Sequence, residues 1–148
     1  MWKLLVLLHA LSAIVLIGAS THHAVIAIRM LRGVFAVRLA RLYALVGAVA
    51  YAVTFVLGAV AYPRFRHLVR AAYLDEYASW ASRLFEAKED LAALALPLVI
   101  GALIVARFVD SKSDRHVLVT YAFTVTTIAT IVWFNVVSGL LITMTKAG

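Results

Sequence analysis

The sequence predicts an all-α integral membrane protein, and three observations support this. Hydrophobic residues make up 65% of the 148 residues and charged residues 14%, whereas soluble domains average roughly 45–50% and about 25%. The mean hydropathy is +0.99. A helix that crosses ~30 Å of hydrocarbon needs about 20 mostly apolar residues, and four stretches meet this requirement: 4–28, 42–62, 91–109 and 117–142. We therefore expect a four-helix bundle in which residues 1–148 form a single transmembrane domain.

The first stretch has features of a secretory signal peptide as well as of a membrane span. Trp2 and Lys3 precede the apolar run, and Ala-Ser-Thr at 19–21 is similar to a cleavage site with small residues. The apolar run continues beyond that point to Arg29, and this length is typical of a span rather than of a signal peptide. We expect this stretch to be retained as the first helix.

The segment 63–90 is the one sizeable part of the chain expected outside the hydrocarbon. Tyr62-Pro63 predicts an end or a kink of the second helix, because proline lacks a backbone donor and disfavours helical geometry before it. Residues 68–85 alternate apolar and charged side chains at helical spacing and include Tyr73, Tyr77 and Trp80. This pattern favours an interfacial amphipathic helix between the second and third spans. Pro97 predicts a kink in the third span.

The net charge of +7 predicts contact with anionic lipid rather than with nucleic acid. The basic residues are dispersed along the chain, whereas a nucleic-acid surface gathers them on one face. The connection between the first two spans carries four arginines and no acid: Arg29, Arg32, Arg38 and Arg41. Such a connection is typical of the cytoplasmic side, so we expect both termini outside.

Charged residues stand directly before the third span, in the sequence RLFEAKEDLAALAL at 83–96. At 100° per residue, Glu86, Glu89 and Asp90 share one helical face, while Lys88 points elsewhere. Carboxylates in the first turn are favoured by the helix dipole. One interpretation is a set of ion pairs that joins these acids to the arginines at the exit of the second span, Arg64, Arg66 and Arg70. The other is a functional site for proton transfer or a quinone headgroup, above all at Asp90, because ionisable groups near hydrocarbon are costly.

Histidines and hydroxyl-bearing residues form stripes on the first and fourth spans. His9 and His23 are 14 residues apart, which places them near one helical face and ~21 Å apart. A second stripe begins at His116 and continues through Thr120 and Thr124. Such side chains can hydrogen-bond between helices, or histidines among them can bind a cofactor.

Two histidines four turns apart on one span resemble the haem-binding helices of b-type cytochromes. The opening LHALSAIVLIGAS at 8–20 is similar to the first helix of small bacterial inner-membrane proteins of the CopD-like kind. The resemblance covers about a quarter of the chain and implies a multi-pass protein of the bacterial inner membrane, with haem b or another redox role. It points to His9, His23 and His116 as cofactor-binding candidates. The second and third spans contain no histidine, although a haem held by two histidines needs ligands from two helices at one depth.

Motifs for independent catalysis are missing from the sequence. It contains no nucleophile elbow, phosphate-binding glycine loop, zinc-protease motif or nucleotide fingerprint, so we expect no catalytic residues and no metal site. The chain is therefore predicted to be a small non-catalytic subunit of a bacterial inner-membrane assembly that is linked to electron transport. It would pack on other membrane subunits or on copies of itself. The alternative is an autonomous electron-transfer protein that binds b-type haem or a quinone.

Overall fold

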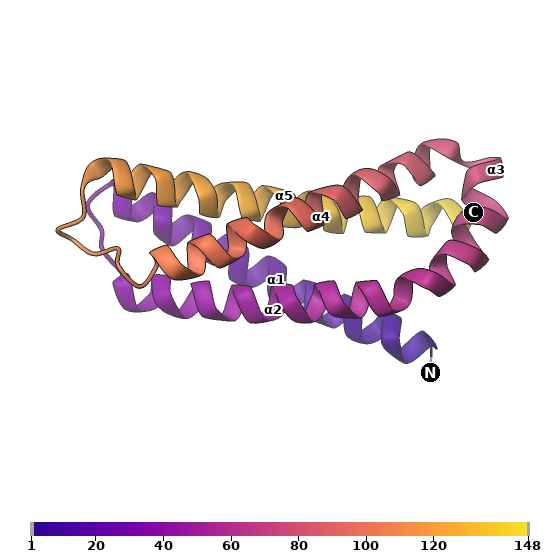
Figure 1. Ribbon diagram of the computed structural model, residues 1–148, viewed down its shortest axis with the longest axis horizontal. Helices are drawn as coiled ribbons and strands as arrows, with labels where there is room; N and C mark the ends of the chain where they lie inside the picture. Colours follow the sequence, from indigo (N-terminus) through magenta and orange to yellow (C-terminus); the bar gives the residue numbers. More distant parts are fainter. Residues whose placement is uncertain (1, 148) are drawn as a thin grey trace.

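The computed structural model describes residues 2–147, and the side chains of residues 2–145. All regular structure in this part of the chain is helical, as expected. Four long helices lie side by side: α1 (Trp2–Leu31), α2 (Val37–Phe65), α4 (Ser79–Val105) and α5 (Arg115–Ala147). A π-helix, η1 (Arg66–Leu74), and the short α3 (Asp75–Tyr77) connect α2 to α4 across one end of the bundle (Figure 1).

The helices run up and down, so the chain begins and ends at the end that carries η1 and α3 (Figure 1). The opposite end carries the two connections 32–36 and 106–114. Gly33 has a φ of +82° in the first of these connections, a conformation that glycine adopts without steric cost. α1 packs on α2 and α5, and α4 packs on α5 and α2. The arginine-rich first connection therefore lies at the same end as the third connection.

The second helix does not end at Tyr62-Pro63, which is one of the two predicted outcomes, an end or a kink. Pro63 lies inside α2, which continues to Phe65 and passes directly into η1. The backbone N–H of Arg66 donates to the carbonyls of Tyr62 and Pro63, so the helical bonding resumes immediately after the proline. The chain changes direction over the π-helical turns (Figure 1), which are a recognised cause of helix bending. Residues 66–77 therefore continue directly from α2 and form an amphipathic segment at this end of the bundle, in the region where the sequence predicts an interfacial helix.

The third long helix begins earlier than predicted. α4 starts at Ser79, so Glu86, Glu89 and Asp90 lie two to three turns inside it. The explanation by the helix dipole is therefore wrong for these acids, because that effect fades within the first turn. α4 runs unbroken through Pro97 and ends at Val105, four residues before the predicted boundary.

Three helices in the described chain are long and apolar enough to cross a membrane: Trp2–Leu31, Val37–Tyr77 and Arg115–Thr145. α4 is not among them, although the sequence predicts a span at 91–109. The charge-free part of α4 covers 91–105, which is about 22 Å at 1.5 Å per residue and shorter than ~30 Å of hydrocarbon. The charged residues at 86–90 prevent a longer apolar stretch within this helix.

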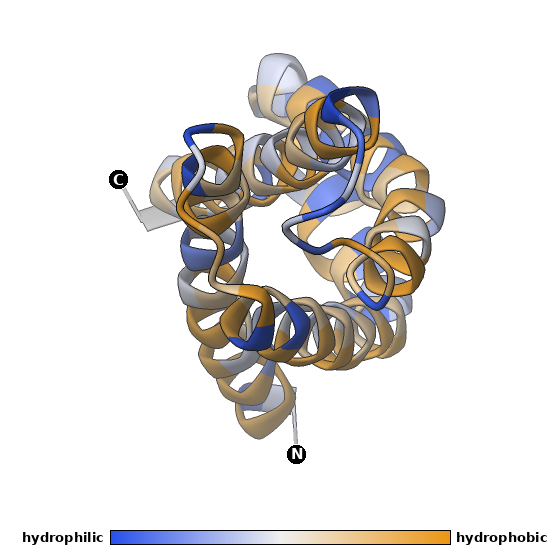
Figure 2. Ribbon diagram, turned by 90° about the vertical axis from the view of Figure 1, so that its left-hand side faces the viewer, coloured by the Kyte–Doolittle hydropathy of each residue, from blue (hydrophilic) through white to orange (hydrophobic). Residues whose placement is uncertain are grey.

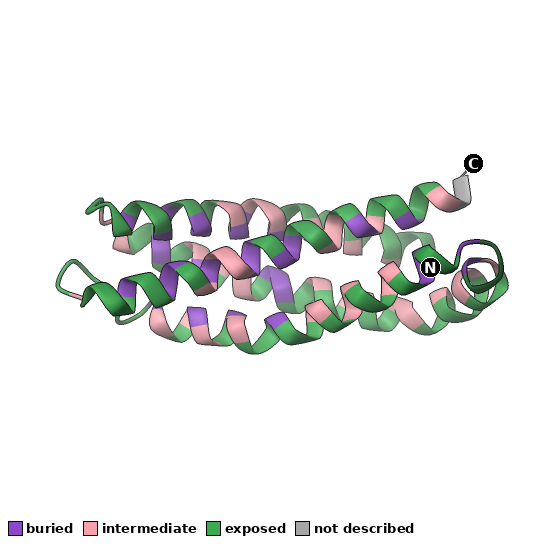
Figure 3. Ribbon diagram, turned by 90° about the horizontal axis from the view of Figure 1, so that it is seen from above, coloured by how far each residue is buried: buried purple, intermediate pink, exposed green. Residues whose placement is uncertain are grey.

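Small side chains fill the interior of the bundle, and large apolar side chains cover its outside. Ala27, Ala95 and Ala102 are at most 4% exposed, whereas Ile14, Leu94 and Phe123 are at least 60% exposed. Figure 3 shows exposed residues along the outer faces of all four long helices. Small interior residues allow helices to approach closely. This distribution is the one expected when acyl chains, rather than water, surround the helices.

Candidate functional site

Arg70 joins η1 to the charged segment of α4. Its guanidinium forms an ion pair with Glu86, and its Nε lies 3.6 Å from Oδ1 of Asp75. The same Asp75 carboxylate accepts a hydrogen bond from the hydroxyl of Ser82. The Arg70 side chain is 20% exposed and that of Glu86 is 51% exposed. These contacts fix the segment that crosses the end of the bundle against α4.

The other predicted members of this charged group lie apart. The Arg64 guanidinium stands over the ring of Trp2, 5.5 Å from its centroid. Arg66 and Asp90 are exposed, and Glu89 is half-buried. Among the residues with described side chains, the ion pairs within 4.0 Å are the two of Arg70. The structure thus brings together Arg70 and Glu86, and leaves Asp90 on the outer face of α4.

Lys88 points into the bundle, and the sequence analysis did not single it out. Its Nζ lies 3.6 Å from the point where a Cβ on Gly139 would stand, which is an ordinary contact distance, so the ammonium packs against α5 at this glycine. The ammonium also lies 5.6 Å from the ring centroid of Phe85. No carboxylate in the described part of the chain lies within 4.0 Å of it. An ammonium held this way in a largely apolar interior is costly.

His9 forms a small polar cluster between α1 and α2. Its ring Nδ1 is 3.0 Å from the carbonyl oxygen of Thr54, so Nδ1 carries the proton and donates. The Thr54 hydroxyl donates to the Ser12 hydroxyl over 2.9 Å, and Ser12 donates to the backbone carbonyl of His9 over 2.9 Å. Gly58 provides the space for the imidazole: a Cβ at that position would stand 3.2 Å from Cε1 of His9. The cluster therefore joins the two helices by interlocking polar contacts.

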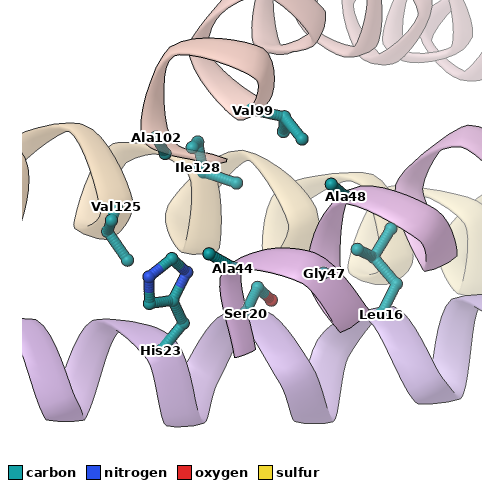
Figure 4. Close-up of a pocket in the computed structure, with 10 residues that line it drawn as sticks. All are labelled: Leu16, Ser20, His23, Ala44, Gly47, Ala48, Val99, Ala102, Val125 and Ile128. Carbon is teal, nitrogen blue, oxygen red and sulfur yellow. The ribbon is translucent and has the colours of Figure 1, made fainter. Parts of the chain in front are cut away.

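His23 and Tyr121 connect α1 to α5 in the interior. The His23 Nε2 and the Tyr121 hydroxyl are 2.5 Å apart, and both residues are buried. His23 and Ser20 are the polar residues that line a central cavity of about 20 Å³, whose walls include Ala44, Gly47 and Ala48. Figure 4 shows the His23 ring and the Ser20 hydroxyl among these small and apolar residues. A cavity of this volume is large enough for about one water molecule.

A larger groove of about 440 Å³ lies between α4 and α5. Its α4 wall includes Pro97, Leu98 and Gly101, and its α5 wall runs along one face from His116 to Thr124. Tyr121 and Ala102 line this groove, and Ala102 also lines the central cavity. The hydrogen bond between Tyr121 and His23 therefore connects the groove to the interior of the bundle.

The three histidines predicted as cofactor ligands do not form a common site. His9 faces Thr54 and Gly58, His23 lines the central cavity, and His116 lines the groove. A haem held by two of them requires both rings to face one cavity, and the central cavity has room for a water molecule rather than a macrocycle. The residues described here do not fit a bis-histidine haem. Between residues 2 and 145 there is also no group of three or more His, Asp or Glu placed to hold a metal ion.

Comparison with known protein families, with curated proteins and with solved structures finds no match to this chain.

Proposed function

We propose that this protein is a small, non-catalytic, multi-pass subunit of a bacterial inner-membrane assembly, with all four long helices embedded in the bilayer. The three apolar helices support membrane insertion. α4 is enclosed by contacts with α2 and α5, so it crosses with them even though its apolar part is short.

The observation that carries the subunit role is the exposed carboxylate of Asp90. The charge-free part of α4 extends about 22 Å, so a helix that crosses ~30 Å of hydrocarbon carries the segment 86–90 to the hydrocarbon boundary. Asp90 is exposed on α4, one turn from Leu94, which is 60% exposed on the same face. An exposed carboxylate at the hydrocarbon boundary is costly, and ionisable residues near hydrocarbon usually face protein or a wet cavity. A partner polypeptide that contributes a hydrogen-bond donor at Asp90 removes this cost.

Two further features support the proposed membrane orientation and the proposed link to electron transport. The end of the bundle with the connections 32–36 and 106–114 carries all four arginines of the first connection, and this density of basic residues favours the cytoplasmic side for this end. Figure 2 looks onto this end and shows hydrophilic residues gathered at the loops. The link to electron transport follows from the resemblance of the first helix to CopD-like proteins. The haem-binding alternative lacks support from the geometry of the histidines.

Purification from native membranes in a mild detergent tests this proposal. We expect the chain to co-purify in fixed stoichiometry with at least one different membrane polypeptide, and Asp90→Asn to weaken that association. Arg66→Gln is a suitable control, because Arg66 is also exposed but lies in η1. A chain that is recovered pure and folded from native membranes, with no second polypeptide at any detergent concentration, would overturn the proposed role.

A further inference from the structure

The groove between α4 and α5 has one polar end and one apolar end. α4 ends at Val105 and α5 begins at Arg115, so His116 and Val105 lie at the loop end of the groove. Pro97, Leu98 and Thr124 lie at its deep end, about 12 Å further along α5 at 1.5 Å per residue. The volume of about 440 Å³ is within the roughly 300–1,000 Å³ typical of ligand pockets.

Two of the hydroxyl groups that line the groove are already used inside the protein. The Thr124 hydroxyl donates to the carbonyl of Thr120 over 2.9 Å, and the Tyr121 hydroxyl is bonded to His23. The deep part of the groove therefore presents a largely apolar surface. His116 and Thr120, which are both exposed, provide polar groups in the half nearest the loop.

Charged residues of both signs stand in or next to the connection at the loop end of this groove, where Arg107, Lys112 and Arg115 outnumber Asp110 and Asp114. Arg115 directly precedes His116, and Arg107 lies two residues after Val105. Both arginines are exposed. Arg41 lies nearby, but its guanidinium already donates hydrogen bonds to the carbonyls of Ala106 and Arg107, directly after the last residue of α4. Basic groups at the mouth of an apolar groove between membrane helices are suited to an anionic headgroup with an acyl chain.

We propose that this groove binds one anionic phospholipid, with an acyl chain between α4 and α5 and the phosphate near Arg107, Arg115 and His116. A quinone is the less suitable occupant, because its uncharged headgroup gains little from the arginines and the donors deeper in the groove are engaged. The inference does not depend on the proposed subunit role. It concerns a lipid site that stabilises the α4–α5 pair.

Native mass spectrometry of the purified full-length chain tests the site, with phosphatidylglycerol and phosphatidylcholine of identical acyl chains as probes. We expect one phosphatidylglycerol to bind at least roughly tenfold more tightly than phosphatidylcholine, given two arginines at the mouth. Arg107→Gln combined with Arg115→Gln removes this preference, whereas Arg38→Gln, on the same end of the bundle, leaves it unchanged. Equal binding of both lipids to the unaltered chain would overturn the proposal.

A second variant tests the acyl-chain position. Gly101 lines the groove, and a Cβ at this position meets no atom within 4 Å, so Gly101→Leu is chosen to add a side chain at the groove wall. We expect it to reduce phosphatidylglycerol binding at least roughly tenfold. Gly18→Leu is the matched control, because Gly18 on α1 also has open space around it and lies outside the groove. If Gly101→Leu fails to fold, Val117→Trp fills the groove from its exposed α5 wall.

A titration with decylubiquinone separates the two kinds of occupant. We expect neither competition with phosphatidylglycerol nor any effect of Gly101→Leu on quinone uptake. Retention of phosphatidylglycerol by the groove-filling variants would overturn the lipid site. Quinone binding that these same variants abolish would also overturn it, because the groove would then be a quinone site.

Discussion

The ammonium group of Lys88 in α4 lies against Gly139 of α5, with its Nζ 3.6 Å from the point where a Cβ at position 139 would stand. Within the described chain this lysine has no carboxylate within 4.0 Å. A lysine whose ammonium is directed into a membrane bundle without a carboxylate partner is a candidate for function. Lys88 is therefore, beside Asp90, a second candidate for a functional role.

Replacing Lys88 by methionine is expected to stabilise the protein. Lys88→Met keeps most of the side-chain volume and removes a poorly solvated charge, so we expect a gain of about 1–3 kcal/mol in the free energy of unfolding. Lys112→Met, in the exposed connection before α5, should change it by less than about 0.5 kcal/mol. Reversible unfolding in mixed detergent micelles measures both. A loss of stability in Lys88→Met would show that the ammonium makes a favourable contact inside the fold.

A methyl group at position 58 is expected to disturb His9. The added Cβ stands 3.2 Å from Cε1 of His9, and the ring is held by its bond to Thr54. We expect Gly58→Ala to destabilise the protein by about 1 kcal/mol, although alanine favours helix. Gly47→Ala is the control on the same helix, because a Cβ added there has open space around it. It should be neutral or stabilising by up to about 1 kcal/mol. Equal stabilisation in both variants would show that the His9 ring moves freely.

The hydrogen bond between His23 and Tyr121 is expected to couple α1 to α5. Single substitutions Tyr121→Phe and His23→Leu each remove it, and the double variant completes a thermodynamic cycle. We expect a coupling energy of about 0.6–2 kcal/mol. His22→Leu in place of His23→Leu provides the control, because His22 bonds to the Gly18 carbonyl and stacks on Tyr43. A coupling energy of zero for His23 and Tyr121 would mean that the two side chains do not interact in the folded protein.

The hydropathy of the sequence predicted the four long helices but not their ends. Hydropathy indicates which residues are suited to hydrocarbon, whereas a helix continues for as long as its backbone hydrogen bonds form. α4 therefore starts at Ser79, well before the apolar residues at 91, and α2 passes through Pro63 because bonding resumes at Arg66. The rule that proline ends a helix did not hold, because the backbone N–H of Arg66 again donates to carbonyls three and four residues before it.

The sequence pattern contained a signal for Lys88 that the analysis did not use. Lys88 shares its helical face with Leu84, Leu91 and Ala95, at spacings of four, three and seven residues, and Ala95 is fully buried. A lysine on the apolar stripe of a helix predicts an inward side chain. The contact of His23 with Tyr121 had no comparable signal, because it joins residues 98 positions apart. Spacing along one helix does not specify which residue of another helix lies opposite.

The ion pair of Arg70 and Glu86 is expected to contribute little to stability. Glu86 is half exposed, so reversing either charge alone should cost about 0.2–1 kcal/mol. The exchange Arg70→Glu with Glu86→Arg should recover most of that loss, because the coupling belongs to the pair. The control combines Asp90→Lys with Arg70→Glu. Because Asp90 forms no ion pair, this combination should recover no stability. Failure of the exchanged pair to recover stability would assign the loss to the contacts of Arg70 with Asp75.

Photo-crosslinking in intact bacterial membranes tests most directly whether another polypeptide covers the outer face of α4. A benzophenone amino acid in place of Leu94 lies one turn from Asp90 and leaves that carboxylate in place. We predict one crosslinked product with a different membrane polypeptide, strongly reduced by Asp90→Asn, while the same probe at Lys112 gives no such product. Crosslinks to lipid or to copies of this chain alone, unchanged by Asp90→Asn, would contradict the proposed role as a subunit of a larger assembly.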